Sequence, residues 1–187
     1  KSSRGRGGIV EEIRVDNIVM NNIQRNAFIF DLFYDKDSKE EPVSERTPVF
    51  RNVHISNVTG SDVKKIGYIT GINEMPISEI SFSNINMVAE NGFTAKTAKN
   101  ITFHNIDFSV KKGAALSFDE CQDIVIDNVH SKVPLANQPI IELNKVSNGF
   151  TNNCIQLTKA DIFCKEIDSE IVWGNNFLNN VKTVKIK

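Results

Sequence analysis

The chain has 187 residues, a formal net charge of −1, 40% hydrophobic residues and 24% charged residues. This balance excludes an intrinsically disordered chain, and it argues against a protein that binds nucleic acid or membranes through bulk charge. Ile and Val contribute 40 residues and Leu and Ala only 14, so strand-forming, β-branched residues dominate, and the 22 Asn residues require a structural reason.

The chain begins with a basic, glycine-rich stretch, KSSRGRGGIV. It lacks the apolar stretch of a secretory signal, and no apolar run anywhere approaches the ~18 residues of a membrane helix. We therefore expect no membrane partner. A glycine-rich basic turn is typical of plain surface, of a weak phosphate nest or of a cationic rim, and Arg4 and Arg6 lie on it.

A short pattern of two apolar residues, a polar residue, Asn and then Ile or Val recurs along the chain. It occurs at residues 13–18, 53–58, 80–85, 101–106 and 124–129, with degenerate copies around Asn153 and Asn176. The intervals between the Asn residues are 40, 27, 21, 23, 25 and 23 residues. Without residues 31–48 the first interval shortens to 22, so one unit takes about two dozen residues.

Each unit alternates with the period of a β-strand, but strict alternation would turn the Asn inward and the following Ile or Val outward. Asn tolerates the left-handed backbone conformation, so we predict a bend at each of these Asn residues that returns the next apolar residue to the core. Stacked units then align the Asn side chains in a ladder, and we expect its amide groups to be buried.

Further strands are predicted at similar places in each unit, at residues 27–30, 67–70, 114–118 and 139–143. Three short sheets per turn fit this arrangement. We predict an all-β fold, a right-handed parallel β-helix of about seven coils that spans residues 1–187 as a single segment. The alternative is an antiparallel β-sandwich, for which Asn91-Gly92 and Asn148-Gly149 are the only hairpin dipeptides.

Residues 31–48 are charged, contain two prolines and lack apolar periodicity. We predict a surface loop insertion, which either borders a binding face or has no function. Its carboxylates are interpreted as solvated charges because catalytic groups are held on rigid elements; they are Asp35, Asp37, Glu40 and Glu41.

The remaining chemistry-bearing residues favour structural roles. The three cysteines, Cys121, Cys154 and Cys164, allow one bridge between Cys154 and Cys164, and they favour buried free thiols. The histidines do not form a metal-ligand set, and we expect surface positions or hydrogen bonds between coils for His54, His104 and His130. Inward positions in the core are predicted for Phe82, Phe103 and Phe118, and an end-capping position for Trp173.

Five segments of the chain resemble the C-terminal half of glycoside hydrolase family 28, the polygalacturonase and rhamnogalacturonase family. They are KSSRGRGGIV at residues 1–10, IRVDNIVM at 13–20, FIF at 28–30 leading to Tyr34, TPVFRNV at 47–53 and GINEMPI at 71–77. The resemblance covers nearly the whole chain and is strongest in residues 1–110.

The resemblance implies an inverting, pectin-degrading hydrolase on a pectin-lyase-like β-helix, with no metal and no organic cofactor. The family's catalytic aspartates lie in motifs that this chain lacks, and only Lys1 corresponds to the last residue of its Arg-Ile-Lys motif. We therefore expect no catalytic residue in this segment, catalytic carboxylates upstream of it, and no hydrolysis by the segment alone.

By the same resemblance, Lys1 meets the carboxylate of a galacturonate unit and Tyr34 lines the cleft, while Arg4 and Arg6 extend the cationic rim. The implied partner is a pectic polysaccharide, galacturonan or rhamnogalacturonan, and the implied location is secreted or periplasmic. The alternative is a non-catalytic β-solenoid that binds carbohydrate or serves in adhesion. We also expect an open end of the β-helix to favour end-to-end self-association.

Overall fold

A computed structural model describes residues 2–33, 39–179 and 181–186. The described chain is all-β, and none of it forms a helix of the length and apolar character needed to span a membrane. Its strands are β1 (Ile9–Val10), β2 (Ile13–Asp31), β3 (Val49–Thr70), β4 (Ile77–Lys96), β5 (Ala98–Asp119), β6 (Gln122–His130), β7 (Pro139–Asn144), β8 (Gly149–Asn152), β9 (Ile162–Ile167), β10 (Ile171–Trp173) and β11 (Lys182–Ile186).

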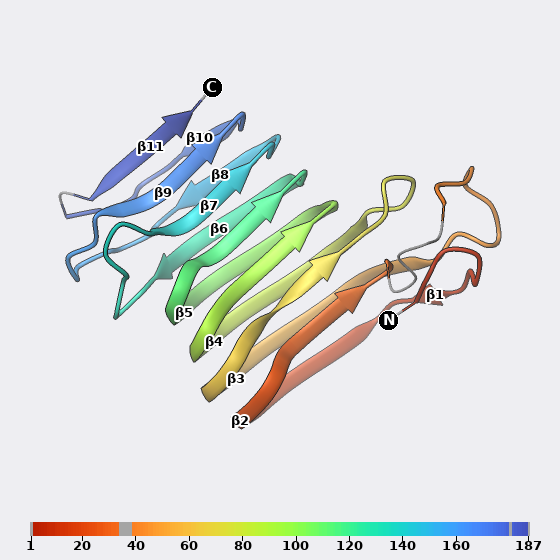
Figure 1. Ribbon diagram of the computed structural model, residues 1–187, viewed down its shortest axis with the longest axis horizontal. Coiled ribbons are helices and arrows are strands. Elements are labelled where there is room, and N and C mark those ends of the chain that lie inside the picture. The colour runs from red at the N-terminus through yellow and green to blue at the C-terminus, as the bar shows by residue number, and fades with distance from the viewer. Residues whose placement is uncertain (1, 34–38, 180, 187) are drawn as a thin grey trace.

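All pairs between these strands are parallel, and each long strand bends to contribute three paired segments to one turn of a parallel β-helix. The first sheet stacks residues 13–16 on 53–56, 80–83, 101–104 and 124–127. The second sheet begins at Ile18–Asn21 on Val58–Ser61. The third sheet stacks residues 28–31, 67–70, 93–96, 116–119 and 141–144 on β9 and β11. The predicted fold class is confirmed, and Figure 1 shows strands of the third sheet side by side.

The solenoid has about five regular turns, slightly fewer than the seven predicted. The stack continues beyond them through short strands, in which β10 pairs with β8 and β11 pairs with β9. This C-terminal part corresponds to the degenerate copies of the repeat, in which fewer apolar residues fill the interior.

The predicted bends at Asn are confirmed. Six Asn residues of the repeat have φ between 51° and 56°, in the left-handed region: Asn17, Asn57, Asn84, Asn105, Asn128 and Asn153. After each bend the next apolar residue returns to the core, as Ile85 and Ile106 do with 1% and 0% exposure. The copy at Asn176 instead contacts the backbone of the preceding level, where its amide donates to the Thr151 carbonyl at 2.9 Å.

The Asn ladder exists, but its predicted burial is wrong. Asn84 donates to the Asn57 side-chain oxygen at 3.0 Å, Asn105 to that of Asn84 at 2.8 Å, and Asn128 to that of Asn105 at 3.1 Å. Asn57, Asn84 and Asn105 are exposed. In the left-handed conformation the side chain points out of the corner, so the ladder joins coils along the surface.

Because the ladder is exposed, we expect backbone strain to account for most of the effect of Asn105→Ala. Ala at φ 54° costs on the order of 1–2 kcal/mol, and the exposed amide bonds add a few tenths. Asn105→Gly loses the same hydrogen bonds without the strain and should cost clearly less. Urea unfolding of both variants measures the difference. Equal losses would show that the bend is not what requires Asn.

The interior is a continuous apolar column whose centre is a cluster of phenylalanines. Phe82 and Phe103, both 0% exposed, stack with centroids 4.8 Å apart and ring planes 12° apart. Phe93 and Phe118 pack edge-on against Phe103 at 5.3 and 5.7 Å. The predicted inward positions of Phe82, Phe103 and Phe118 are confirmed.

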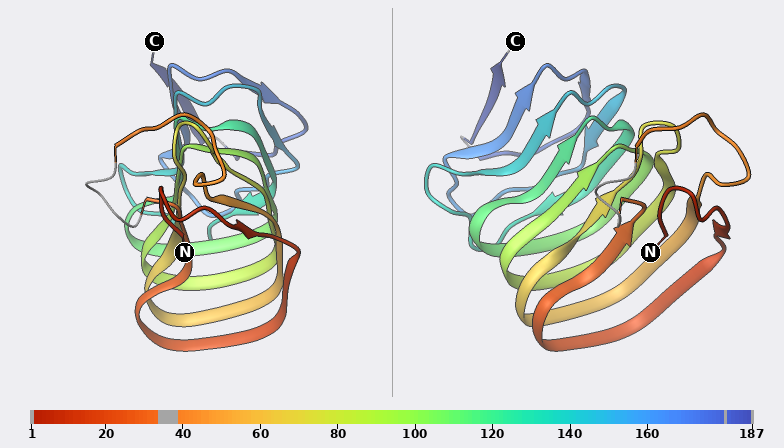
Figure 2. Two further views of the ribbon diagram at one scale, coloured as in Figure 1. Left: turned by 90° about the vertical axis from the view of Figure 1, so that its right-hand side faces the viewer. Right: turned by 45° about the vertical axis from the view of Figure 1, so that its right-hand side comes forward.

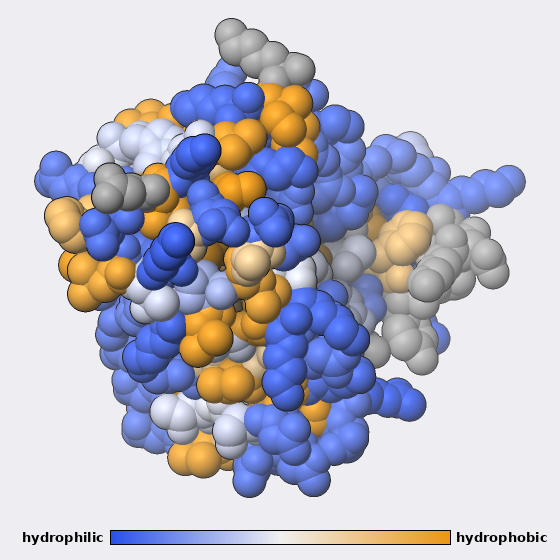
Figure 3. All heavy atoms as spheres, turned by 60° about the vertical axis from the view of Figure 1, so that its left-hand side comes forward, coloured by the Kyte–Doolittle hydropathy of each residue, from blue (hydrophilic) through white to orange (hydrophobic). Residues whose placement is uncertain are grey.

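The three cysteines are free and buried in the described chain, so the alternative of a Cys154–Cys164 bridge is not realised. Trp173, the predicted end cap, is half-buried in β10. Its indole N–H donates to Glu166 at 2.8 Å, and its ring lies 6.3 Å from that of Phe163. Figure 3 looks at this end and shows apolar side chains interspersed with hydrophilic ones. Self-association of the ends stays a prediction.

The insertion was predicted to begin at Asp31, but it begins at least two residues later. Asp31 ends β2, and Leu32 is fully buried, so both belong to the solenoid wall. The described residues 39–48 form turns without a strand. They lie beside the N-terminal stretch, because Gly7 N–H donates to the Arg46 carbonyl at 2.8 Å and β1 pairs with the start of β3. Figure 2 shows these segments projecting from one corner of the solenoid.

Candidate functional site

The candidate site consists of the outer face of the third sheet and three segments at its N-terminal corner, residues 2–8, 39–48 and 71–76. The backbone brings them together. The Ser2 N–H donates to the Asp31 carbonyl at 3.0 Å, and Ser3 forms an antiparallel bridge with Phe33. The chain therefore enters the structure next to β2 on the third sheet. Lys1 and Tyr34 themselves lie outside the described residues.

Arg4 joins two of these segments. Its Nη2 donates to Glu74 Oε2 at 2.8 Å, its Nε donates to Glu74 Oε1, and its guanidinium lies 5.5 Å from the Phe33 ring centroid. Both side chains of the ion pair are only 7% exposed. The hydrogen bond from Arg4 lowers the pKa of Glu74 and raises the pKa of Arg4. The geometry thus gives Arg4 a positioning role between the N-terminal turn and residues 71–76.

This ion pair predicts a pH effect on stability. The pKa of Glu74 in the folded chain lies below its unfolded value of about 4.3, so the stabilisation is complete above that pH and is lost as pH falls through the folded pKa. We expect Glu74→Gln to lower the free energy of unfolding at pH 7. We also expect this free energy to fall less steeply on acidification, because the variant takes up at most about one proton fewer on unfolding. Urea unfolding from pH 7 to 3 measures both. Parallel curves for the two proteins would contradict the assignment.

Arg6 is exposed on the turn whose shape the glycines set. Gly5, Gly7 and Gly8 have φ of 79°, 64° and 85°, and a Cβ on Gly7 would lie 2.1 Å from the Glu45 carbonyl oxygen. Glycine is therefore required at position 7, both for its backbone conformation and for this close approach. The turn presents Arg6 to solvent beside the third sheet.

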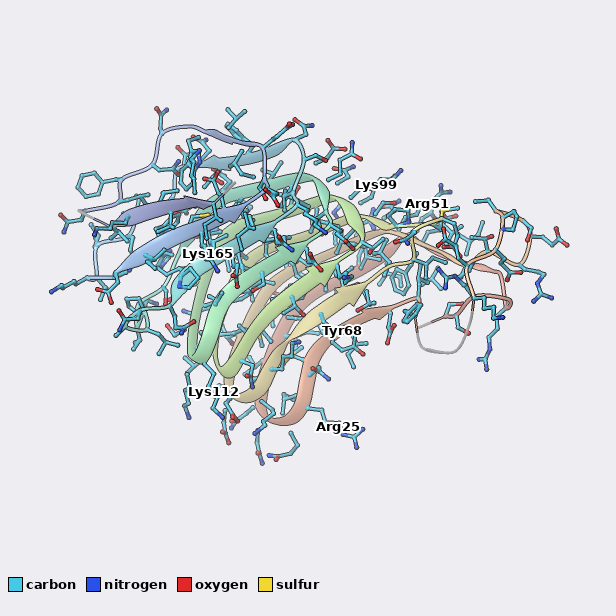
Figure 4. The ribbon with its side chains drawn as sticks, turned by 45° about the horizontal axis from the view of Figure 1, so that its top comes forward. Arg25, Arg51, Tyr68, Lys99, Lys112 and Lys165 are labelled. Atoms are coloured by element: carbon cyan, nitrogen blue, oxygen red, sulfur yellow. The ribbon has the colours of Figure 1, made fainter. Side chains whose placement is uncertain are left out.

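The third sheet's outer face carries a group of polar side chains at its N-terminal end. The Tyr68 hydroxyl donates to Asp31 Oδ2 at 3.1 Å, and the Phe33 N–H donates to Asp31 Oδ1 at 2.9 Å. Lys65 donates to the Thr94 hydroxyl at 3.1 Å, and its ammonium lies 5.5 Å from the Tyr68 ring centroid. Figure 4 shows Tyr68 on β3, toward one end of the stack of coils, and Lys165 on β9, toward the other end.

A shallow open cleft of about 530 Å³ continues from this group along the same face. Ile167 of β9 lies at its far end. The rest of its border consists mainly of outward side chains of β3, β4, β5 and β7, namely Thr70, Thr94, Lys96, Ser117, Asp119, Glu142 and Asn144. The lining combines hydroxyl, amide and charged groups with apolar surface, to which Ile69, Ala95, Phe118 and Ile167 contribute. Such a composition allows both hydrogen bonds and apolar contacts with a ligand.

The carboxylates of the cleft are paired. Asp119 accepts from Lys96 at 2.8 Å and from the Asn144 amide at 2.7 Å, and Glu142 accepts from Lys165 at 3.0 Å. Burial raises the pKa of Asp119, but the bonds from Lys96 and Asn144 outweigh it and lower that pKa overall. Asp119 therefore stays ionised at neutral pH, whereas a general acid requires a raised pKa.

Other candidates from the sequence lie apart from the cleft. Of the insertion's carboxylates, Asp35 and Asp37 fall outside the described residues, and the half-buried Glu41 lies 3.7 Å from Arg46. His54 bonds Ser81 at 2.6 Å and His104 bonds Asp127 at 2.6 Å, which confirms hydrogen bonds between coils for both. Within the described ranges no group of three His, Cys, Asp or Glu side chains is arranged to hold a metal ion.

Sequence reasoning missed Asp31, Lys65 and Tyr68. The available signal was the alternation in residues 67–70, where Gly67 and Ile69 are buried and Tyr68 and Thr70 are partly exposed. It identified a strand, but only the stacking of coils shows that these outward residues meet Asp31 and Thr94.

The family model described as glycosyl hydrolases family 28 matches residues 1–102. The matched region contains the N-terminal turn, residues 71–76 and the first three strands of the third sheet. Searches of curated proteins and of solved structures found no match.

Proposed function

Because the chain belongs to glycosyl hydrolases family 28, we propose that it is part of a polygalacturonase-like enzyme that cleaves galacturonosidic bonds of pectic polysaccharides with inversion. The family match over residues 1–102 carries this proposal. A secreted or periplasmic location belongs to the same proposal, since pectin is extracellular.

In this proposal the segment supplies a wall of the substrate cleft. Lys1 and Arg6 provide positive charge for galacturonate carboxylates, and Tyr34 covers a sugar face. Arg4 supports them through its ion pair with Glu74, which fixes the turn that follows Lys1. The bond from Ser2 to Asp31 supports this placement, because it puts the start of the chain at the edge of the third sheet.

We further propose that the acid and base of the reaction come from coils preceding residue 1. Inversion requires two carboxyl groups ~6.5–9.5 Å apart, one of them with a raised pKa. Asp119 does not meet the requirement of a raised pKa, since the hydrogen bonds from Lys96 and Asn144 lower its pKa.

The test compares the 187-residue chain with the same chain extended by its native preceding residues. Incubated with polygalacturonate, the extended chain should release reducing ends, and the shorter chain should release none. Proton NMR of the first anomer formed distinguishes inversion from retention. Turnover by the shorter chain would contradict the upstream position of the carboxylates. Binding without turnover by the extended chain would favour a non-catalytic carbohydrate-binding solenoid.

A further inference from the structure

Lys65, which lies just before the third-sheet segment of β3, differs from the lysines of that sheet in its surroundings. Lys96 pairs with Asp119 at 2.8 Å and Lys165 pairs with Glu142 at 3.0 Å. In the described chain Lys65 has no carboxylate within ion-pair distance, and its ammonium donates only to the uncharged Thr94 hydroxyl. It is half-buried, whereas its sequence neighbour Lys64 is exposed and pairs with Glu90.

A half-buried ammonium without a counter-ion is unfavourable. Removing a charge from water costs free energy unless an opposite charge or several hydrogen bonds replace the lost hydration. Thr94 and the face of Tyr68 replace only part of it. Burial accordingly lowers the pKa of Lys65. An anion bound on the outer face would supply the missing charge.

Lys65 lies where such an anion can belong to a longer ligand. Thr94, its hydrogen-bond partner, also lines the cleft of about 530 Å³. From there the cleft continues along the helix axis past Ser117 and Asn144, whose hydroxyl and amide groups can bond sugar hydroxyls. The positive charge of Lys65 and the hydroxyl and amide groups of the cleft together fit a chain of sugar units of which at least one carries a carboxylate. The cleft's own carboxylates, Asp119 and Glu142, are already paired with lysines.

The position agrees with the substrate path of the proposed function. Ser2 pairs with Asp31 of β2, and Leu32 N–H bonds the Thr70 carbonyl of β3, so two strand spacings separate the level of Ser2 from that of Lys65. At ~4.8 Å per spacing this is about 10 Å along the axis, on the order of the length of a disaccharide. A pectic chain held at Lys1 can therefore extend to Lys65 along one face.

We propose that Lys65, with Thr94 and the adjoining cleft, forms a further subsite that selects a uronate carboxylate over a neutral or methyl-esterified sugar. This inference rests on the proposed function and adds a specificity-determining residue to it. In the bound state the ammonium donates to the uronate carboxylate while the cleft's hydroxyl and amide groups bond the neighbouring sugar unit.

The experiment measures the dissociation constants of trigalacturonate and of its fully methyl-esterified form by isothermal titration with the 187-residue chain. Three proteins are compared: wild type, Lys65→Gln and Lys99→Gln. Lys99 is a matched control, because it is exposed, has no acidic partner in the described chain and lies at the start of β5 away from the cleft. Circular dichroism and urea unfolding establish that all three are folded.

We expect Lys65→Gln to weaken binding of the free acid about tenfold, the scale of one charge-assisted hydrogen bond, and to leave the ester unchanged. Lys99→Gln should bind both as wild type does. Unchanged binding of the acid by Lys65→Gln overturns the subsite, and so does an equal loss for acid and ester, which would indicate packing instead of charge. Failure of wild type to bind the acid also overturns it. The proposed function is judged separately, by turnover of polygalacturonate by the extended chain.

Discussion

Phe103→Ala is expected to lower the free energy of unfolding by about 3–5 kcal/mol, the usual range for removing a buried aromatic ring. Phe103 is fully buried, stacks on Phe82 at 4.8 Å and also contacts Phe93 and Phe118. Phe82 and Phe93 lie on β4, and Phe118 lies on β5 with Phe103, so the cavity would interrupt the column where these two coils meet. Parallel strands on every side restrict collapse of the wall into the space.

Urea unfolding followed by circular dichroism measures this loss. Val19→Ala serves as the control, because Val19 is 84% exposed and its truncation should change stability by less than about 0.5 kcal/mol. A loss below about 1.5 kcal/mol for Phe103→Ala would contradict the view that the phenylalanine column holds the coils together.

The repeat made much of the fold predictable. Strict alternation would turn the apolar residues before and after the repeat Asn to opposite faces, so the strand had to bend there for both to reach the core. The left-handed conformation at Asn84 and Asn105 supplies this bend. The same reasoning placed Phe82 and Phe103 inside. It wrongly predicted buried Asn side chains, because their direction depends on the side of the corner to which the left-handed residue projects, and the repeat does not define that side.

A second series of bends escaped prediction. Five residues before the repeat Asn, the backbone is again left-handed, at Glu12, Asn52, Glu79, Asn100, Asp123 and Asn148. Several residue types occupy this position, so composition gives no signature for it. The stacking of coils imposes the left-handed conformation at this position. The conformational preference of the residue itself therefore does not predict it.

The candidate site was less predictable than the fold because its contacts cross the repeat. Arg4 and Glu74 are 70 residues apart and Tyr68 and Asp31 are 37 apart, and both separations span the insertion, so the repeat alone does not align these residues. The insertion between β2 and β3 changes the spacing, and the non-repetitive segments 2–8 and 71–76 fold against it. Resemblance to a family identified the basic turn. The role of Glu74 becomes visible only in the folded structure, where it meets Arg4.

Gly71→Ala is expected to lower the free energy of unfolding by about 3 kcal/mol, at the upper end of the range for overpacking. A Cβ at this position would lie 2.0 Å from the Thr97 carbonyl oxygen and 2.9 Å from the Ile77 backbone nitrogen. Both are backbone atoms of paired coils, and the Gly71 N–H itself bonds the Lys96 carbonyl at 3.0 Å. The clash can be relieved only by moving coils apart or by displacing the segment that carries Glu74.

Gly113→Ala separates this steric effect from backbone preference. Gly113 has φ of 67° and open space where a Cβ would lie, so Ala there should cost only the left-handed strain, about 1 kcal/mol. At Gly71 the backbone is not in the left-handed region, so close approach alone determines the loss. Urea unfolding of the two variants decides between them. Equal losses, or a smaller loss at Gly71, would mean that the coils can separate at this corner and that residues 71–76 do not depend on their packing to hold Glu74 against Arg4.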